Sequence, residues 1–163
     1  MTNFMILCVE DESEVRDALV RDIQTFASTF RIEAAEDVED ARSVVEECLG
    51  EDNELALVLC DHMLPGTSGV EFLVELNQSP HTRLARKVLV TGQAGLDDTI
   101  QAVNKADLHA YIAKPWSRVE LEEVVRKLLT DYVVDEADDL LPFVNVLDAP
   151  RLLEALKQRE VRE

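Results

Sequence analysis

Short apolar runs of strand length alternate along this chain with segments whose apolar residues recur at helical spacing. This alternation is typical of repeated β-α units, which build a parallel sheet covered by helices on both faces. The expected strands are residues 4–9, 31–35, 55–60, 87–91 and 108–113. The expected helices are residues 13–27, 38–49, 70–77 and 96–105, followed by a fifth helix; Ser13 and Ser117 are suited to cap the first and the fifth. We therefore predict an α/β fold with a doubly wound, five-stranded parallel sheet.

Four of the expected strands are followed by, or end on, a polar residue of a different chemical kind. Glu10 and Asp11 follow the first strand and Asp61 follows the third, whereas Thr91 ends the fourth and Lys114 follows the fifth. Because the carboxyl ends of parallel strands lie along one edge of a sheet, these side chains should meet in one crevice. Close carboxylates repel unless a cation or a proton lies between them, and an all-oxygen ligand set favours Mg²⁺ or Mn²⁺. The sequence thus predicts a metal site beside a carboxylate nucleophile. Phosphoryl transfer to Asp61 would use these groups.

The charge of the chain restricts its partners. The formal net charge is −18, from 34 acidic against 16 basic residues, so the surface should repel nucleic acid and anionic membranes. No apolar run approaches the roughly 20 residues that a membrane helix requires, and the first strand runs straight into acidic residues where a signal peptide would need small ones. We expect a cytoplasmic protein that binds neither nucleic acid nor membrane directly.

The motifs at the strand ends resemble those of the receiver domain of two-component response regulators. They are Val9–Glu12, Asp61–Gly69, Val90–Gly92 and Tyr111–Pro115, and they occur in the order that this family has. The resemblance covers about residues 4–130 and implies the flavodoxin-like strand order 2-1-3-4-5. We assign residues 1–130 to a receiver domain and residues 131–163 to an acidic linker and a C-terminal helical extension.

The resemblance implies a role for each group of the phosphorylation site. Asp61 would accept the phosphoryl group, and the metal would be held by Glu10, Asp11, Asp61 and the backbone carbonyl of Met63. Lys114 would pair with a phosphoryl oxygen as a point charge.

Further expectations concern the switch that follows phosphorylation. Thr91 would bond to the phosphoryl group and Tyr111 would turn inward with it, while the bond between Lys114 and Pro115 would be cis. The donor would be a phosphohistidine on a sensor histidine kinase or a phosphotransfer protein. A downstream protein effector would read the surface of the fourth helix, fifth strand and fifth helix. The chain would be a signalling receiver that catalyses only its own phosphorylation and dephosphorylation, and no other enzyme.

Three alternatives to this interpretation differ in the residues that they require. A haloacid dehalogenase-like phosphatase needs a second aspartate two residues after the nucleophile, where this chain has Met63. A flavodoxin-like flavin binder needs a Ser/Thr/Gly-rich loop after the first strand, where this chain has Glu10–Glu12. The third alternative keeps the receiver but makes it a portion of a larger chain with an absent effector enzyme, because Lys114–Trp116 resembles receivers fused to signalling enzymes.

The tail after residue 131 carries apolar residues that a receiver does not need. Its acidic stretch, Pro142 and the helix start at Asp148–Pro150 predict a linker and a final helix over residues 148–161. The apolar tail residues are Leu140, Leu141, Phe143, Val144, Leu152, Leu153 and Leu156. Left in solvent they would form a contact patch, which the same chain, a second copy or an absent domain could cover. We expect a homodimer through this extension, or through the face of the fourth helix, fifth strand and fifth helix.

Overall fold

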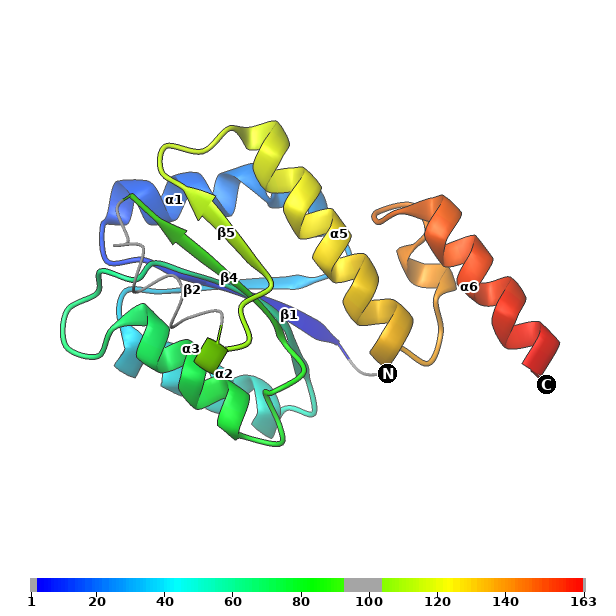
Figure 1. The fold of residues 1–163 in the computed structure, drawn as a ribbon, viewed down its shortest axis with the longest axis horizontal. Coiled ribbons are helices and arrows are strands. Elements are labelled where there is room, and N and C mark those ends of the chain that lie inside the picture. Colours follow the sequence, from blue (N-terminus) through cyan, green and yellow to red (C-terminus); the bar gives the residue numbers. More distant parts are fainter. Residues whose placement is uncertain (1–2, 93–103, 163) are drawn as a thin grey trace.

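A five-stranded parallel sheet forms the centre of the protein, which is described by a computed structural model over residues 3–92 and 104–162. The strands are β1 (Phe4–Val9), β2 (Arg31–Ala35), β3 (Glu54–Cys60), β4 (Arg86–Thr91) and β5 (Ala110–Ala113). They follow the order β2-β1-β3-β4-β5, which confirms the predicted topology (Figure 1). β3 is therefore the central strand, and Asp61 follows it directly.

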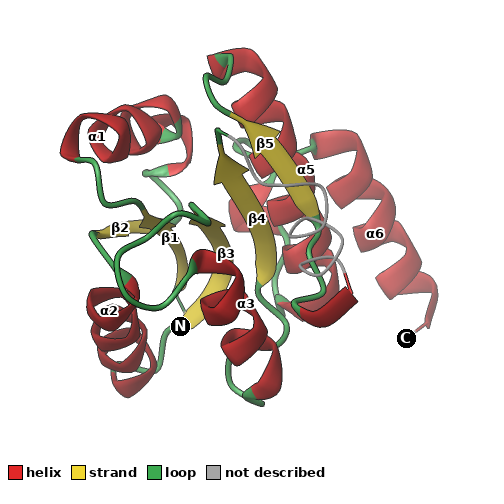
Figure 2. Ribbon diagram, turned by 60° about the vertical axis from the view of Figure 1, so that its left-hand side comes forward, coloured by secondary structure: helices red, strands yellow, loops and turns green. Residues whose placement is uncertain are grey.

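Helices cover both faces of the sheet (Figures 1 and 2). Those described are α1 (Ser13–Asp22), α2 (Val38–Gly50), α3 (Gly69–Gln78), α5 (Arg118–Glu136) and α6 (Ala149–Arg162), with short 3₁₀ turns η1 (Gln24–Phe26) and η2 (Leu141–Phe143). Apolar residues of α1 and α5 share one core with one face of the sheet, and those of α2 and α3 share a second core with the other face. Most of the expected fourth helix, residues 96–103, lies outside the described residues.

The central strands are buried on both faces, which explains why they read as continuous apolar runs. Along β1, Ile6 and Cys8 belong to the core under α1 and α5, whereas Leu7 and Val9 belong to the core under α2 and α3. Successive side chains of a strand point to opposite faces, so a strand that is covered twice must be apolar at every position.

Two predicted boundaries and one predicted helix cap are wrong. The first helix ends at Asp22 instead of residue 27, because the backbone leaves helical geometry at Ile23 and continues as η1. Ser13 is the first helical residue, and the N-cap position belongs to Glu12, whose side chain makes no capping hydrogen bond. β5 begins at Ala110 instead of residue 108, because Asp107 adopts φ 55° and turns the chain before the strand.

The fifth helix also differs from the expectation, since α5 continues past residue 130 to Glu136. Tyr132 and Val133 are buried and prolong the apolar stripe of this helix, so the residues expected to open an acidic linker remain helical. Ser117 caps the helix as predicted, because its hydroxyl oxygen accepts a hydrogen bond from the backbone N–H of Glu120.

The tail packs on its own chain. Leu140, Phe143, Leu147 and Leu152 are buried in the core shared by α1 and α5. The ring of Phe143 lies 5.8 Å from that of Phe4. The structure therefore gives most of the apolar tail a partner within the same molecule, which differs from the expectation that a second copy covers it.

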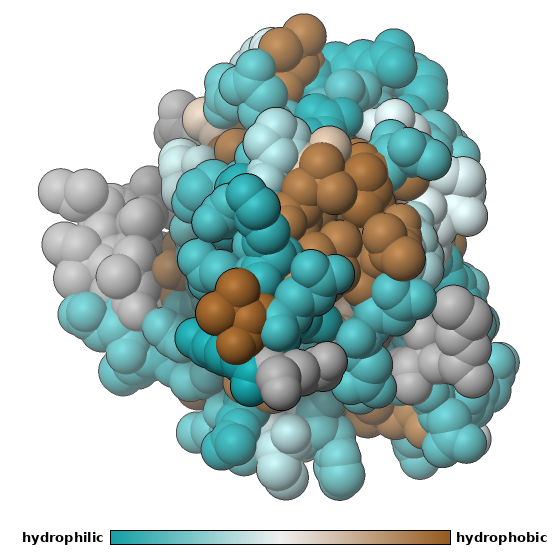
Figure 3. All heavy atoms as spheres, turned by 90° about the vertical axis from the view of Figure 1, so that its right-hand side faces the viewer, coloured by the Kyte–Doolittle hydropathy of each residue, from teal (hydrophilic) through white to brown (hydrophobic). Residues whose placement is uncertain are grey.

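Hydrogen bonds from Arg159 hold α6 beside the C-terminal half of α5. The guanidinium group of Arg159 donates hydrogen bonds to the carbonyl oxygens of Val134, Ala137 and Asp138. These three residues lie in the last turn of α5 and directly after it. Leu141 and Leu153 stay 64% and 52% exposed, and Figure 3 shows apolar side chains gathered on this side of the molecule. Within the described ranges, no helix combines the length and apolar character needed to span a membrane.

Candidate functional site

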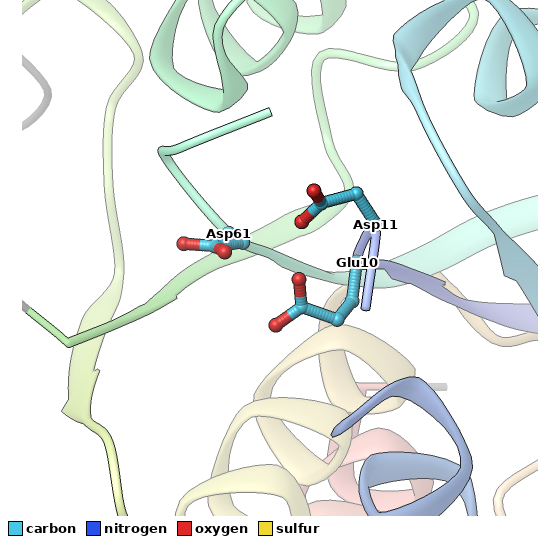
Figure 4. Close-up of side chains that lie close together, drawn as sticks. All are labelled: Glu10, Asp11 and Asp61. Atoms are coloured by element: carbon cyan, nitrogen blue, oxygen red, sulfur yellow. The ribbon is translucent and has the colours of Figure 1, made fainter. Parts of the chain in front are cut away.

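Three carboxylates meet at the carboxyl ends of β1 and β3. Glu10 and Asp61 are buried, and their backbone N–H groups continue the sheet by donating to Ala35 and Val9. Asp11 follows Glu10 and is exposed. One carboxylate oxygen from each of Glu10, Asp11 and Asp61 lies within 4.8 Å of the others (Figure 4). The crevice that the strand ends predicted is therefore present, with the Asp11 side exposed to solvent.

Lys114 supplies the only side-chain ammonium bonded to this cluster in the described part of the chain. Its Nζ lies 3.0 Å from Oδ2 of Asp61 and also donates to Oε1 of Glu10. The backbone N–H of Lys114 donates to Thr91 at the end of β4, and the Lys114–Pro115 bond is cis, as the resemblance implied. One ammonium cannot neutralise three carboxylates, so the site keeps an excess of negative charge.

The buried setting changes the pKa of both partners. Burial raises the pKa of Glu10 to about 6; the hydrogen bond from Lys114 opposes this change, and the charge of Asp61 adds to it. Burial alone would lower the pKa of Lys114, but its hydrogen bonds to Glu10 and Asp61 outweigh burial and raise it. Lys114 therefore stays a cation at neutral pH.

Thr91 brings a hydroxyl to the same edge of the sheet. The residue is buried at the end of β4, and its Oγ1 has no hydrogen-bond partner among the described residues. A buried hydroxyl without a partner is unfavourable by about 1–3 kcal/mol, so Thr91 is available to a polar group that enters the site. Tyr111, the expected partner of Thr91 in the switch, lies on the edge strand β5 and is 40% exposed.

The loop after Asp61 depends on a glycine whose role the sequence analysis did not assign. A Cβ atom at Gly69 would lie 1.8 Å from the backbone oxygen of Asp61, and the N–H of Gly69 donates to the carbonyl of His62. The N–H of Met63, the residue whose carbonyl we expected to hold the metal, donates to Oδ1 of Asp61 at 3.3 Å. In the sequence, the only sign of this close approach between Gly69 and the backbone of Asp61 was the glycine at the end of the Asp61–Gly69 motif.

Arg16 is a second residue that the sequence analysis missed. Its guanidinium group donates to the backbone carbonyl of Glu10 at 2.9 Å, from the first half of α1. The contact ties the turn that carries Glu10 and Asp11 to the helix that follows. A basic residue shortly after an acidic pair was its only sign in the sequence.

The family model of the response regulator receiver domain matches residues 6–126. This chain belongs to the response regulator receiver family. The receiver is 32% identical over 122 residues to the hydrogenase transcriptional regulatory protein HoxA of Cupriavidus necator, which covers 75% of this chain and 23% of HoxA. It is 29% identical over 124 residues to the phosphate regulon transcriptional regulatory protein PhoB of Escherichia coli, which covers 76% of this chain and 51% of PhoB. The receiver thus spans about a quarter of HoxA and about half of PhoB.

Solved structures share the fold of this receiver. A CheY-like receiver domain protein from Methanospirillum hungatei matches with a TM-score of 0.70 and 24% identity, over 83% of this chain and all of that one. The receiver domain of an HD domain-containing protein from Pseudomonas fluorescens matches with a TM-score of 0.69 and 23% identity, over 80% of this chain and 97% of that one. At these identities the two structures support the fold alone.

Membership of the receiver family indicates what a cluster such as Glu10, Asp11 and Asp61 does in general. Receivers are signalling domains of two-component systems, whose function involves phosphorylation and contacts with kinases and effector domains. They bind Mg²⁺ in an acidic pocket, and three clustered carboxylates, one of them exposed, suit that ion. The donor set of this receiver therefore fits a magnesium site.

Proposed function

We propose that this receiver accepts a phosphoryl group on Asp61 in a reaction that requires Mg²⁺, and that the added charge switches a protein-binding surface. One observation carries the proposal: the carboxylate of Asp61 lies 3.0 Å from the Lys114 ammonium, in a cluster that also holds the carboxylates of Glu10 and Asp11. A nucleophilic carboxylate, a fixed cation and two further acidic groups are what phosphoryl transfer to aspartate requires.

Glu10, Asp11, Asp61 and the backbone carbonyl of Met63 would hold the metal. When bound, Mg²⁺ would offset the negative charge of the acidic cluster and supply Lewis-acid stabilisation for an incoming phosphoryl group. Mn²⁺ has the same preference for oxygen ligands and should replace it. Without a divalent cation, Glu10 and Asp11 repel the donor anion from Asp61.

Asp61 is the attacking group in the proposed step. One of its carboxylate oxygens forms a bond to phosphorus while the bond between phosphorus and the donor histidine nitrogen breaks. The electron pair of that bond stays on the imidazole, which takes up a proton from solvent. Lys114 stabilises the charge that builds up on the phosphoryl oxygens, and the hydroxyl of Thr91 donates to one of them after transfer.

The donor in this proposal is a phosphohistidine on a sensor histidine kinase or a phosphotransfer protein. Movement of Thr91 toward the phosphoryl group leaves space into which Tyr111 turns, and this changes the exposed surface around β5 and α5. A downstream protein effector, or a second copy of the receiver, reads that surface. The receiver catalyses its own phosphorylation and dephosphorylation and no other reaction.

Labelling by acetyl phosphate tests this function. Mass spectrometry should find one added phosphoryl group in the presence of Mg²⁺ and none in excess chelator. Asp61→Asn should take up no label, while Asp52→Asn, which changes an exposed aspartate on the loop before β3, should label at the wild-type rate. Labelling of Asp61→Asn, or labelling that survives the chelator, would refute the proposal.

Beryllofluoride, which stands in for the phosphoryl group on an aspartate, tests the switch. With Mg²⁺ it should shift the amide signals of Tyr111 and of residues 110–125, well beyond the neighbours of Asp61. A response confined to the acidic cluster would show that the charge on Asp61 is not transmitted to β5 and α5.

A further inference from the structure

The turn between β5 and α5 carries Lys114 at its first position and joins an edge strand to a helix. β5 is a four-residue edge strand that pairs only with β4 among the described strands. Pro115, Ser117 and Arg118 are exposed, and Trp116 is the one partly buried residue of this stretch after Lys114. Trp116 packs against the core shared by α1 and α5.

A hydrogen bond joins this turn to the far end of α1. The indole N–H of Trp116 donates to Oδ2 of Asp22 at 2.9 Å, across 94 positions in the sequence. Asp22 is the last residue of α1, its side chain is 13% exposed, and Nε of Arg21 lies 3.3 Å from its other oxygen. A carboxylate at the C-terminal end of a helix is disfavoured by the helix dipole. Helix stability therefore does not account for an aspartate at this position, whereas the bond to Trp116 does.

Packing alone does not orient the indole ring. A hollow of about 460 Å³ opens beside it and is lined by residues that include Val15, Ala18 and Pro115. A ring with open space next to it can rotate or slide unless a directional contact holds it. The hydrogen bond to Asp22 supplies that contact.

The position of Trp116 bears directly on Lys114, two residues earlier in the same turn. The Lys114 side chain must cross from the end of β5 to place its ammonium between Glu10 and Asp61. A lysine carries its charge at the end of a flexible side chain, so the position of the ammonium depends on the position of the Lys114 backbone. A shift of the turn would pull Nζ away from the carboxylates.

We propose that Asp22 and Trp116 are positioning residues for phosphorylation: their hydrogen bond fastens the β5–α5 turn to α1 and so sets Lys114 against Asp61. The proposal rests on the proposed function, because its effect on rate is an effect on phosphoryl transfer to Asp61. Neither side chain touches the reacting atoms. Their influence passes through the backbone of the turn.

Rates of labelling by acetyl phosphate at saturating Mg²⁺ test the proposal. Trp116→Phe keeps an aromatic ring but removes the donor, and Asp22→Ala removes the acceptor. Each should slow labelling about tenfold, since small misplacements of a charged catalytic group have effects of this size or larger. The double variant should be no slower than either single one, because all three lack the same bond.

Two controls separate positioning from general damage. Asp22→Asn keeps an oxygen acceptor and should restore most of the rate, and Arg118→Ala changes an exposed residue of the same stretch and should leave the rate unchanged. The Mg²⁺ concentration for half-maximal labelling should move less than about twofold, because Glu10, Asp11 and Asp61 stay in place. Wild-type rates in Trp116→Phe and Asp22→Ala, or effects that multiply in the double variant, would overturn the proposal.

Chemical acetylation of Lys114 gives a readout that does not depend on phosphorylation. In the wild type, acetic anhydride should modify the ion-paired Lys114 more slowly than the exposed Lys127 of α5. Loss of the Asp22–Trp116 bond should raise the ratio of the two rates several-fold, as measured by mass spectrometry. An unchanged ratio would show that the bond does not hold Lys114, even if Asp61 proved not to accept a phosphoryl group.

Discussion

Nζ of Lys114 lies 3.0 Å from Oδ2 of Asp61, although the two residues follow strands that are not neighbours in the sheet. β4 runs between β3 and β5 and ends in Thr91, whose buried hydroxyl is unpaired among the described residues. The lysine thus reaches past one strand to the central carboxylate. The contact places a cation where a nucleophile and an incoming phosphoryl group would both need one.

Replacing Lys114 by Met should slow labelling of Asp61 by acetyl phosphate about 10²–10³-fold. The variant removes the cation that stabilises charge on the phosphoryl oxygens, and groups of this kind contribute effects of that size. Lys114→Arg should remain impaired, because a planar guanidinium does not replace a compact ammonium between two carboxylates. Lys127→Met, on the exposed side of α5, should label normally. Equal rates in Lys114→Met and Lys127→Met would contradict the role of the lysine.

Gly69→Ala should destabilise the protein by about 3 kcal/mol or more and abolish labelling. The new methyl group would lie 1.8 Å from the backbone oxygen of Asp61, so the loop behind the nucleophile must move. Gly50→Ala is the matched control, because a Cβ at that helical position meets no atom within 4 Å. Urea unfolding and the acetyl phosphate assay measure the two effects. A Gly69→Ala protein as stable as Gly50→Ala would show that the loop can relax.

Lys87 should make the protein more stable as the pH rises from 8 to about 10. Burial lowers the pKa of this fully buried lysine to about 8, although the charge of Asp107 opposes the change. An unfolded lysine has a pKa of about 10.4, so between the two values the unfolded chain holds the extra proton and stability increases with pH. Below pH 8 both states are protonated and this dependence disappears.

Urea unfolding of the wild type and Lys87→Met across this pH range isolates the contribution of the lysine. The difference between the two proteins should change by at most about 3 kcal/mol in favour of the wild type as pH rises. The carbonyls of Arg83 and Ala85 lose their ammonium partner in the variant, which lowers its stability by a pH-independent amount. A difference that stays constant from pH 8 to 10 would mean that Lys87 does not titrate in this range.

Arg159→Ala should loosen the tail without unfolding the receiver. The guanidinium holds three carbonyls at the end of α5, and its removal should destabilise the docked α6 by about 1–3 kcal/mol. Hydrogen exchange should accelerate over residues 149–162 and stay unchanged in β1 and β3. Lys157→Ala, on the exposed side of α6, is the control. If both variants exchange like the wild type, Leu152 and its apolar neighbours hold α6 without Arg159.

The strands and the acidic cluster could be predicted because their signals are local. A doubly covered strand must be apolar where both of its faces are buried, as β1 and residues 55–60 of β3 are, and a polar residue directly after such a strand must lie at the sheet edge. The proximity of Glu10, Asp61 and Lys114 could be predicted from one rule, that the carboxyl ends of parallel strands lie along the same edge of the sheet. The start of β5 was missed because Asp107 adopts a left-handed conformation for which a glycine would have been the usual sign.

By itself, the sequence determined the order of strands and helices, the membership of the acidic cluster and the family. Each of these follows from periodicity over a few residues or from motifs at strand ends. Only the tertiary structure decided that the tail packs on its own α5, that Arg159 closes the end of that helix, and that Asp22 meets Trp116. Such contacts join side chains far apart in the chain, and their geometry depends on how whole helices pack, which no local pattern of residue types encodes.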